Sequence, residues 1–330
     1  LLTAHEHFEK LGMRPFAAQA RALAEQLGFQ MAGEAGASRA EDDAEEPELP
    51  DASGRPPRFE ERSFRIIFFT DMEESTSTLE RLGVPFTGAT SSFYEPTRAK
   101  MKRVCRAIGV DAPAGLVART EADVQRAAET LRFPLFVKHY NSYASVDLSR
   151  MSRVRTPAGL FRQARKMLSR HGGALIEEYI DGTECTVLVA ENPDDPERPT
   201  TYTPMQYRFP DGESFKHADL KWVDYDDMAC VPVEDPALAA RLRDVCARFF
   251  LGLGGTSFGR CDVRVDATGR PFILEMNANC GIYYPPEEPG SADLCLLNDP
   301  AGHAGFTRTL VAAGERAPHG LARRVEVVLD

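Results

Sequence analysis

The segment GRCDVRVDATGRPFILEMNANCG, residues 259–281, contains the side chains whose types and spacing point most directly to chemistry. Alternating apolar residues on both sides of the sequence ATGR predict two strands joined by a turn. If the strands pair symmetrically about that turn, Asp262 lies opposite Glu275, and Arg260 lies opposite Asn277. Side chains alternate between the two faces of a strand, so these four polar groups are expected to share one face.

The chemistry of this polar face depends on what offsets its negative charge. Two carboxylates directly opposite each other in a sheet lie roughly 5 Å apart and repel. A Mg²⁺ ion would offset the repulsion, because it binds carboxylate and amide oxygens and keeps positions for phosphates and water. The alternative is a solvated face on which water and salt screen the two charges. The opposite face is predicted to be apolar, with Cys261, Val263, Val265, Phe272, Leu274 and Met276.

Composition and charge exclude several classes of protein. The 330 residues carry a net charge of −11, which argues against general binding to nucleic acid or to anionic membranes. No apolar run has the length of a membrane span. The seven cysteines form no CxxC pair, which favours buried thiols in a reducing compartment. We therefore expect a cytoplasmic protein, and an organellar targeting segment stays open because the chain begins at Leu1 instead of Met.

Secondary-structure patterns divide the chain into a front part and a mixed α and β part. Residues 1–32 predict an amphipathic helical segment, and 33–62 form an acidic stretch rich in Pro, Gly and Ser that predicts a disordered linker. Strand and helix patterns then alternate, with a strand at 133–140 and a helix at 156–173 that begins near Pro157. This alternation, together with several hairpins, predicts layered α+β structure instead of one parallel sheet.

Charged residues at the ends of predicted strands form a second group of candidates. Lys138 ends an apolar strand, where its ammonium either reaches a phosphate or extends into solvent. Glu177 and Glu178 point to opposite faces of a later strand, so at most one of them turns inward. Glu184 follows a turn and could join that inward carboxylate. None of these features is a P-loop or a GxGxxG fingerprint.

The order of these segments resembles the ATP-grasp superfamily, and most closely the D-alanine–D-alanine ligases. The similarity runs from about residue 82 to about residue 281, through LGVPFTG, FPLFVK, EEYIDGTECTV, FKHADLKW and the final hairpin. It implies an α+β ATP-grasp fold, in which two α+β subdomains clasp the nucleotide after a truncated pre-grasp segment. The implied divisions are 63–94 for the remnant of a substrate domain, 95–182 for the central subdomain, and 183–330 for the carboxy-terminal subdomain with the metal site.

The resemblance also implies roles for individual residues. The implied nucleotide contacts are Arg98, Lys138, Ser145, Glu177, Glu178, Ile180, Glu184, Lys221 and Leu274. The implied catalytic residues are Arg260, Lys221 and Gly281. Asp262, Glu275 and Asn277 match the ligands of two Mg²⁺ ions, for which Mn²⁺ is the alternative. Arg98 stands where the family usually has lysine, a replacement that keeps the charge and changes the geometry.

The activity that the resemblance implies is ATP-dependent ligation of a carboxylate to an amine through an acyl phosphate. Small-molecule substrates, amino acids foremost, and a homodimer are the expected partners. Substrate selection is expected to differ from that of the ligases, because Pro286 and Glu287 match their Ser-Leu pair, which holds the second substrate's carboxylate. Tyr143-Ala144-Ser145 likewise replaces a Gly-Ser-Ser loop. The alternative is an inactive or regulatory ATP-binding module, because residues 1–94 show no substrate-anchoring glutamate motif.

Overall fold

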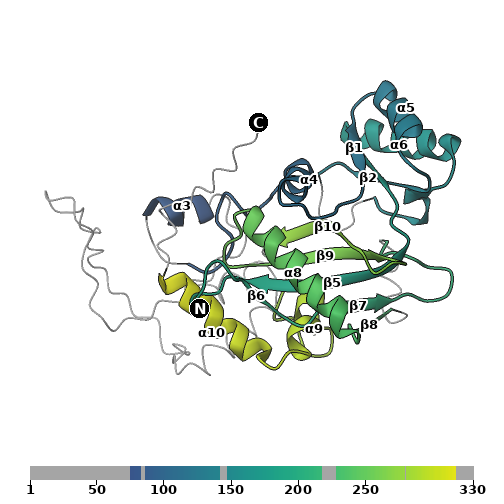
Figure 1. The fold of residues 1–330 in the computed structure, drawn as a ribbon. Coiled ribbons are helices and arrows are strands. Elements are labelled where there is room, and N and C mark those ends of the chain that lie inside the picture. The colour runs from purple at the N-terminus through teal and green to yellow at the C-terminus, as the bar shows by residue number, and fades with distance from the viewer. Residues whose placement is uncertain (1–74, 83–85, 142–146, 218–227, 279, 317–330) are drawn as a thin grey trace, which may run out of the picture. The chain divides into compact units, whose positions relative to one another are not determined.

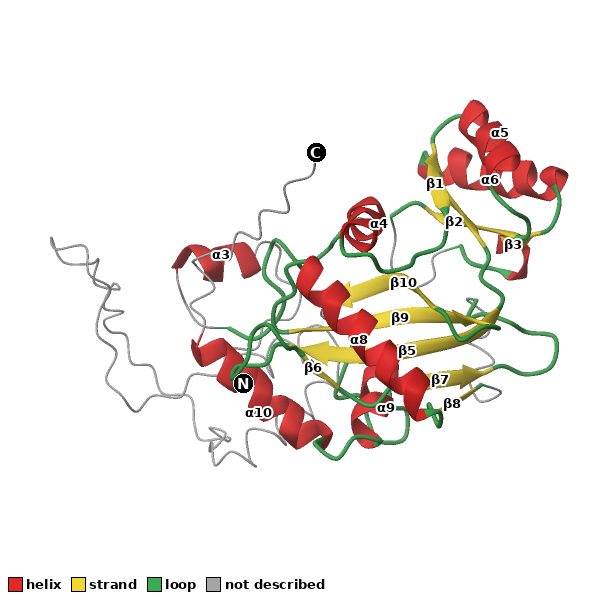
Figure 2. Ribbon diagram, viewed as in Figure 1, coloured by secondary structure: helices red, strands yellow, loops and turns green. Residues whose placement is uncertain are grey.

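The computed structural model describes residues 75–82, 86–141, 147–217, 228–278 and 280–316. From Thr76 onward the chain forms one compact unit. Its strands lie in two sheets, each covered by helices (Figure 1, Figure 2). The strand pairs among the described residues are antiparallel. The predicted α+β layering is therefore confirmed.

The first sheet has the strand order β1-β4-β2-β3. The strands are β1 (Gly115–Ala118), β4 (Ala174–Glu178), β2 (Leu135–His139) and β3 (Arg153–Val154). Helices α5 (Glu121–Thr130) and α6 (Pro157–His171) lie together on one face (Figure 1), and the short helix η1 (Arg150–Ser152) precedes β3. The core between these layers includes Leu135, Val137, Leu160, Met167 and Ile176.

Local sequence signals fix the ends of both covering helices. A capping box starts α5, where Thr120 Oγ1 accepts from the Asp123 N–H and the Asp123 carboxylate accepts from the Thr120 N–H. Pro157 occupies the first turn of α6, where its missing N–H costs no hydrogen bond. Gly172 ends α6 in the left-handed conformation, with φ +69°.

The second sheet has the strand order β10-β9-β5-β7-β8, with β6 paired to β5. The strands are β10 (Pro271–Ala278), β9 (Phe258–Asp266), β5 (Gly182–Ala190), β7 (Met205–Arg208), β8 (Ala229–Pro232) and β6 (Thr200–Thr201). Helix α8 (Pro236–Gly252) lies across one face (Figure 1), and α4 (Arg98–Ala107) packs beside it. Helices α9 (Ser291–Leu297) and α10 (Gly302–Arg316) share a separate core with Leu188 and Phe258, and α3 (Ser75–Leu82) precedes these elements in the chain.

The β9–β10 hairpin confirms the predicted register at its polar end. Asp262 pairs with Glu275, and Arg260 pairs with Asn277. Toward the turn the register shifts, because a bulge lies between Ile273 and Glu275. An extra residue in one strand reverses the side-chain alternation beyond it.

This bulge corrects the predicted apolar face. Ile273 is buried in the core with Val263, whereas Phe272 and Leu274 are only partly buried. The assignment of Phe272 and Leu274 to the core face was therefore wrong. The Arg270 guanidinium lies 5.3 Å from the centre of the Phe272 ring, and Leu274 faces the cleft described below.

Several predictions concern residues that the structure does not describe. The helical segment 1–32, the linker 33–62 and residues 63–74 and 83–85 of the segment 63–94 lie outside the described residues. The division at 182 also stays a prediction, although the first sheet ends at Glu178 and the second begins at Gly182. Among the described residues, no helix combines the length and apolar character that a membrane span requires. All seven cysteines are free, and all but the half-buried Cys230 are buried.

Candidate nucleotide and metal site

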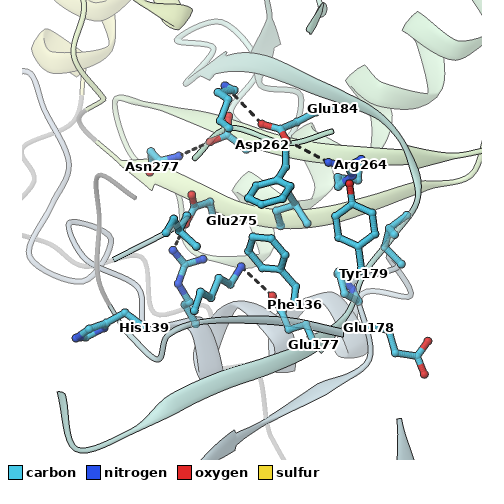
Figure 3. A pocket seen from close by; sticks show the side chains of 18 of the residues that line it. Phe136, His139, Glu177, Glu178, Tyr179, Glu184, Asp262, Arg264, Glu275 and Asn277 are labelled. Carbon is cyan, nitrogen blue, oxygen red and sulfur yellow. Dashed lines mark hydrogen bonds and ion pairs between the residues drawn. The ribbon is translucent and has the colours of Figure 1, made fainter. Parts of the chain in front are cut away.

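Both sheets contribute side chains to one cleft, shown in Figure 3. The predicted site residues that line it are Arg98, Lys138, Glu177, Glu178, Ile180, Glu184, Arg260, Asp262, Leu274, Glu275 and Asn277. Ser145 and Lys221 lie outside the described residues. Residues far apart in the chain thus meet in one cleft, and their roles toward a nucleotide and a metal stay predictions.

The Asp262 carboxylate accepts four hydrogen bonds from described side chains of the cleft wall. Arg260 donates to it from Nε at 3.1 Å and from Nη2 at 3.0 Å. Asn277 Nδ2 donates at 2.9 Å, and Thr186 Oγ1 donates at 2.8 Å. Burial alone would raise the pKa of Asp262, but Arg260 and Lys216 lower it to about 2. The carboxylate is therefore ionised at neutral pH.

Glu275, on the neighbouring strand, forms an ion pair with Arg98. Arg98 is the first residue of α4, and Thr97 caps that helix by accepting the Lys100 N–H. This cap fixes the start of α4 and therefore the point from which Arg98 reaches β10. Each of the two hairpin carboxylates thus contacts its own arginine, Asp262 through Arg260 and Glu275 through Arg98.

The oxygen donors on this polar face fit a hard divalent cation. Asp262 and Glu275 supply two carboxylates, and Asn277 supplies an amide oxygen when its Nδ2 donates to Asp262. Carboxylate and amide oxygens are the ligands that Mg²⁺ takes in nucleotide sites. In this conformation Arg98 forms an ion pair with Glu275, and Arg260 forms one with Asp262. A bound cation would therefore replace at least one of these ion pairs.

A buried carboxylate between two lysines lies beside the hairpin. Glu177 is 3% exposed, and its two oxygens contact Lys102 and, at 2.8 Å, Lys138. Burial alone would raise the pKa of Glu177, but the two ammonium groups lower it to about 2. Burial lowers the pKa of Lys138; Glu177 opposes this effect, and Arg98 adds to it.

Among the described residues, the charges around Lys138 are not balanced. Arg98, Lys102 and Lys138 face two carboxylates, Glu177 and Glu275. A partly buried cluster with an excess positive charge gains stability from an anion, since opposite charges interact strongly where little water is present. The cluster is therefore suited to phosphate oxygens.

The next strand end separates an inward from an outward glutamate. Glu177 points into the cleft, whereas Glu178 points away and pairs with the exposed Arg132 at 2.8 Å (Figure 3). This confirms that at most one of the two turns inward. Among the described residues, the Ile180 N–H donates no hydrogen bond, so it is available to the edge of a bound base.

Aromatic rings form the apolar wall of the cleft. Phe136 and Phe215 make an edge-to-face contact with their ring centres 4.9 Å apart, and the ring centre of Tyr179 lies 6.1 Å from that of Phe136. The Tyr179 hydroxyl donates to the Ser214 carbonyl at 2.9 Å, which fixes the ring. Leu274, displaced toward the cleft by the bulge, lines the same cavity. These groups can enclose a planar base.

Glu184 faces the cleft between two cations. Its carboxylate lies 3.6 Å from Lys216 Nζ and 3.3 Å from Arg264 Nη1. Arg264 also donates to the Gly182 and Ser214 carbonyls. The carboxylate is therefore held in a fixed position, where it could accept hydroxyl donors of a ligand.

Comparison with known proteins decides the family. The profile of the family described as "D-ala D-ala ligase C-terminus" matches residues 112–284, which is more than half of the chain. The chain belongs to the D-alanine–D-alanine ligase family. This agrees with the resemblance found in the sequence.

The ligases that this chain matches are distant relatives. The D-alanine–D-alanine ligase of Chromohalobacter salexigens is 30% identical over 251 residues, which cover 74% of this chain and 73% of that protein. The ligase of Pseudomonas putida is 28% identical over 251 residues, which cover 74% of this chain and 72% of that protein. The crystal structure of the Bacillus anthracis ligase complexed with ATP superposes with a TM-score of 0.57 at 19% identity and covers 74% of each chain. The described part of this ligase-family chain therefore has the ATP-grasp fold.

The segment between β10 and α9 contains the residues that the sequence matched to the catalytic glycine and to the second-substrate contact of the ligases. Gly281, Pro286 and Glu287 are exposed, and among the described residues they do not line the cleft. Ser291, at the start of α9, lines it instead and accepts from the Tyr207 hydroxyl at 2.7 Å. Gly281, Pro286 and Glu287 thus lie in the segment that leads to the cleft residue Ser291.

Three charged residues of the site were assigned no role from the sequence. Arg264 follows Arg260 and Asp262 at strand spacing, so the same alternation could have identified it. Lys102 lies one helical turn after Arg98, which places both on one face of α4. Lys216 lies within the segment FKHADLKW, but only its second lysine had been assigned a role.

Proposed function

We propose that this chain is an ATP- and Mg²⁺-dependent ligase that joins a small-molecule carboxylate to an amine through an acyl phosphate. The observation that carries the proposal is the meeting of Asp262, Glu275 and Asn277 with Arg98 and Lys138 in one cleft. Oxygen donors for a cation and cations for phosphates are the two requirements of phosphoryl transfer.

The nucleotide is proposed to lie along the aromatic wall. The Ile180 N–H and the Glu178 carbonyl would contact the base edge, and Glu184 would accept from the ribose hydroxyls. Lys138 and Arg98 would contact the phosphates, where the excess positive charge of the cluster is concentrated. The ATP complex of the Bacillus anthracis ligase, which shares the fold, supports ATP as the nucleotide.

Activation of the carboxylate explains the need for ATP. A carboxylate is a poor acyl donor, since its leaving group would be oxide. A carboxylate oxygen attacks the γ-phosphorus, the bond to the β-phosphate oxygen breaks, and ADP and an acyl phosphate result. Arg98 and Lys138 neutralise the phosphate oxygens and fix their orientation. Mg²⁺, held by Asp262, Glu275 and Asn277, supplies further charge neutralisation at these oxygens when bound.

The amide bond forms in the second step. The amine nitrogen attacks the carbonyl carbon, inorganic phosphate leaves, and the nitrogen loses a proton. Negative charge develops on the carbonyl oxygen, and preorganised donors lower the barrier. Arg260 and the Gly281 N–H are proposed for this role. Arg260 lies beside Asp262 in the cleft, and Gly281 follows β10 by three residues.

Product analysis tests this proposal. The purified chain is incubated with ATP, MgCl₂ and a pool of L- and D-amino acids, and the products are identified by mass spectrometry while ADP release is measured. A new amide together with stoichiometric ADP and phosphate supports ligation. Phosphate release without a new amide would identify a kinase-like or hydrolytic activity instead. Tight ATP binding with no turnover would identify the inactive module.

A further inference from the structure

One buried carboxylate holds both ends of the 281–290 loop, which connects β10 to α9. Asp293 is 1% exposed. Its Oδ1 accepts the Tyr283 N–H at 2.7 Å, and its Oδ2 accepts the Gly290 N–H at 3.0 Å and the Tyr284 N–H at 3.4 Å. Bonds from backbone N–H groups to a carboxylate are stronger than neutral ones. The beginning and the end of the loop are therefore fixed to the same point.

A histidine from another helix completes this arrangement. His303, in the first turn of α10, shares a 2.8 Å hydrogen bond between its Nε2 and Asp293 Oδ1. Among the described residues, Asp293 thus has four hydrogen-bond partners, three from the loop and one from α10. The Tyr283 hydroxyl also bonds Thr307 Oγ1 of α10 at 2.7 Å.

The backbone of this loop requires such support. Tyr283 has φ +63°, a left-handed conformation that bulky residues rarely adopt and that surrounding contacts must maintain. Its N–H bond to Asp293 and its hydroxyl bond to Thr307 hold it from both ends.

The fixed loop places Tyr284 against Gly281. A β-carbon at Gly281 would collide with the Tyr284 hydroxyl, and one at Gly290 would lie 2.8 Å from Tyr284 Cδ2. The ring therefore lies between two glycines, while the Tyr284 residue stays 53% exposed. The backbone of Gly281 and the phenol of Tyr284 are presented together at the surface.

We propose that Asp293 and His303 are positioning residues for amide formation: they fix the 281–290 loop, so that Gly281 and Tyr284 face the incoming amine. The proposal rests on the function proposed above. Among the described residues, neither Asp293 nor His303 lines the nucleotide cleft. Their loss is therefore expected to slow the second step and to spare the first.

A small nucleophile separates the two steps. Hydroxylamine attacks the acyl phosphate carbonyl, displaces phosphate and gives a hydroxamate without needing a fitted amine site. Full-length His303→Leu and Asp293→Asn are compared with the native chain, using ATP, MgCl₂ and the amino-acid pool with or without hydroxylamine. His303→Gln is the matched control, because its amide can still donate to Asp293.

The expected result is selective. Amide product falls about tenfold or more in His303→Leu, since a misplaced group near the reacting atoms commonly costs this much. Hydroxamate yield and the affinity for a fluorescent, non-hydrolysable ATP analogue stay within about twofold of the native chain. His303→Gln recovers most of the amide yield. An equal loss of amide and hydroxamate, or an unchanged amide yield, overturns the proposal.

Hydrogen exchange tests the positioning independently of catalysis. In His303→Leu and Asp293→Asn, exchange in 281–290 is expected to accelerate about tenfold or more, with little change in 258–278. Unchanged exchange in 281–290, or equal acceleration in both segments, overturns the proposal. If the native chain yields neither hydroxamate nor amide, the ligase function fails, and the exchange result alone decides whether Asp293 and His303 fix the loop.

Discussion

Replacement of Glu177 by glutamine is expected to destabilise the chain by about 3 kcal/mol at pH 7. The Glu177 side chain is buried and contacts the ammonium groups of Lys102 and Lys138. Against the opposing effect of burial, these groups lower the pKa of Glu177 from 4.5 to about 2. Because one pKa unit corresponds to about 1.4 kcal/mol, the lowered pKa corresponds to about 3 kcal/mol of stability.

The pH dependence of this effect has a defined sign. Since the folded pKa lies below the unfolded value, the contribution of Glu177 is complete above pH 4.5 and is lost as the pH falls toward 2. The difference in unfolding free energy between the native chain and Glu177→Gln should shrink from about 3 kcal/mol at pH 7 to about 2 kcal/mol at pH 3.5.

Urea unfolding, followed by circular dichroism at both pH values, measures this difference. Glu178→Gln is the matched control, because Glu178 is the adjacent residue on the opposite face and pairs with Arg132, whose side chain is 87% exposed. Its loss should cost far less, since Arg132 is almost fully exposed and water screens its charge, although the Glu178 side chain itself is 12% exposed. Equal costs for the two variants, or a difference that does not shrink in acid, would refute the electrostatic account of Glu177.

Three further substitutions test separate parts of the structure. Glu275→Ala is expected to reduce the affinity for Mn²⁺, measured by electron paramagnetic resonance in the presence of a non-hydrolysable ATP analogue, by at least about 100-fold. Glu288→Ala, at an exposed residue, is the control and should leave this affinity unchanged. Lys138→Met should weaken binding of the ATP analogue about 10- to 100-fold, as measured by calorimetry, because a charge-assisted bond to phosphate is lost; unchanged affinity would exclude Lys138 from the phosphate site. Thr120→Ala should cost about 1 kcal/mol of unfolding free energy by removing the α5 cap, with no effect on ATP affinity.

The hairpin shows both the reach and the limit of reading strands from sequence. Alternation placed Asp262 and Glu275 on one face correctly, although the strands do not pair symmetrically next to the turn, where Val265 pairs with Pro271; the bulge restores the predicted register at Glu275. The bulge before Glu275 could not be predicted, since an added residue leaves the apolar pattern plausible in either register. Only packing against α8 and α4 distinguishes Ile273 from its neighbours as the core residue.

Side-chain clusters were predicted only in part. Alternation allowed one inward glutamate at the end of β4 but did not say which, because both faces of a buried strand read alike. The structure selects Glu177, which has two ammonium partners inside the cleft, whereas Glu178 meets only an exposed arginine. Such partners come from α4 and β2, which are distant in sequence, so their convergence is a property of the tertiary fold.

Nucleotide and metal binding are expected to be coupled in this chain. Arg98 pairs with Glu275 and Arg260 pairs with Asp262, so both proposed metal carboxylates already contact a guanidinium. A cation without nucleotide must displace these arginines and leave them without anions, which is costly for partly buried charges. Phosphates remove that cost, because they can accept the arginines as the cation takes the carboxylates.

The coupling predicts that Mn²⁺ binds at least about tenfold more weakly without the ATP analogue than with it. Arg98→Met should reduce this difference in Mn²⁺ affinity, because it frees Glu275 from its ion pair. Methionine keeps much of the side-chain volume and removes the charge. Arg106→Met, on the exposed face of the same helix, should leave the difference in Mn²⁺ affinity unchanged. Electron paramagnetic resonance titrations of the three chains decide the matter. Equal Mn²⁺ affinity with and without nucleotide in the native chain would mean that the two ion pairs do not compete with the metal.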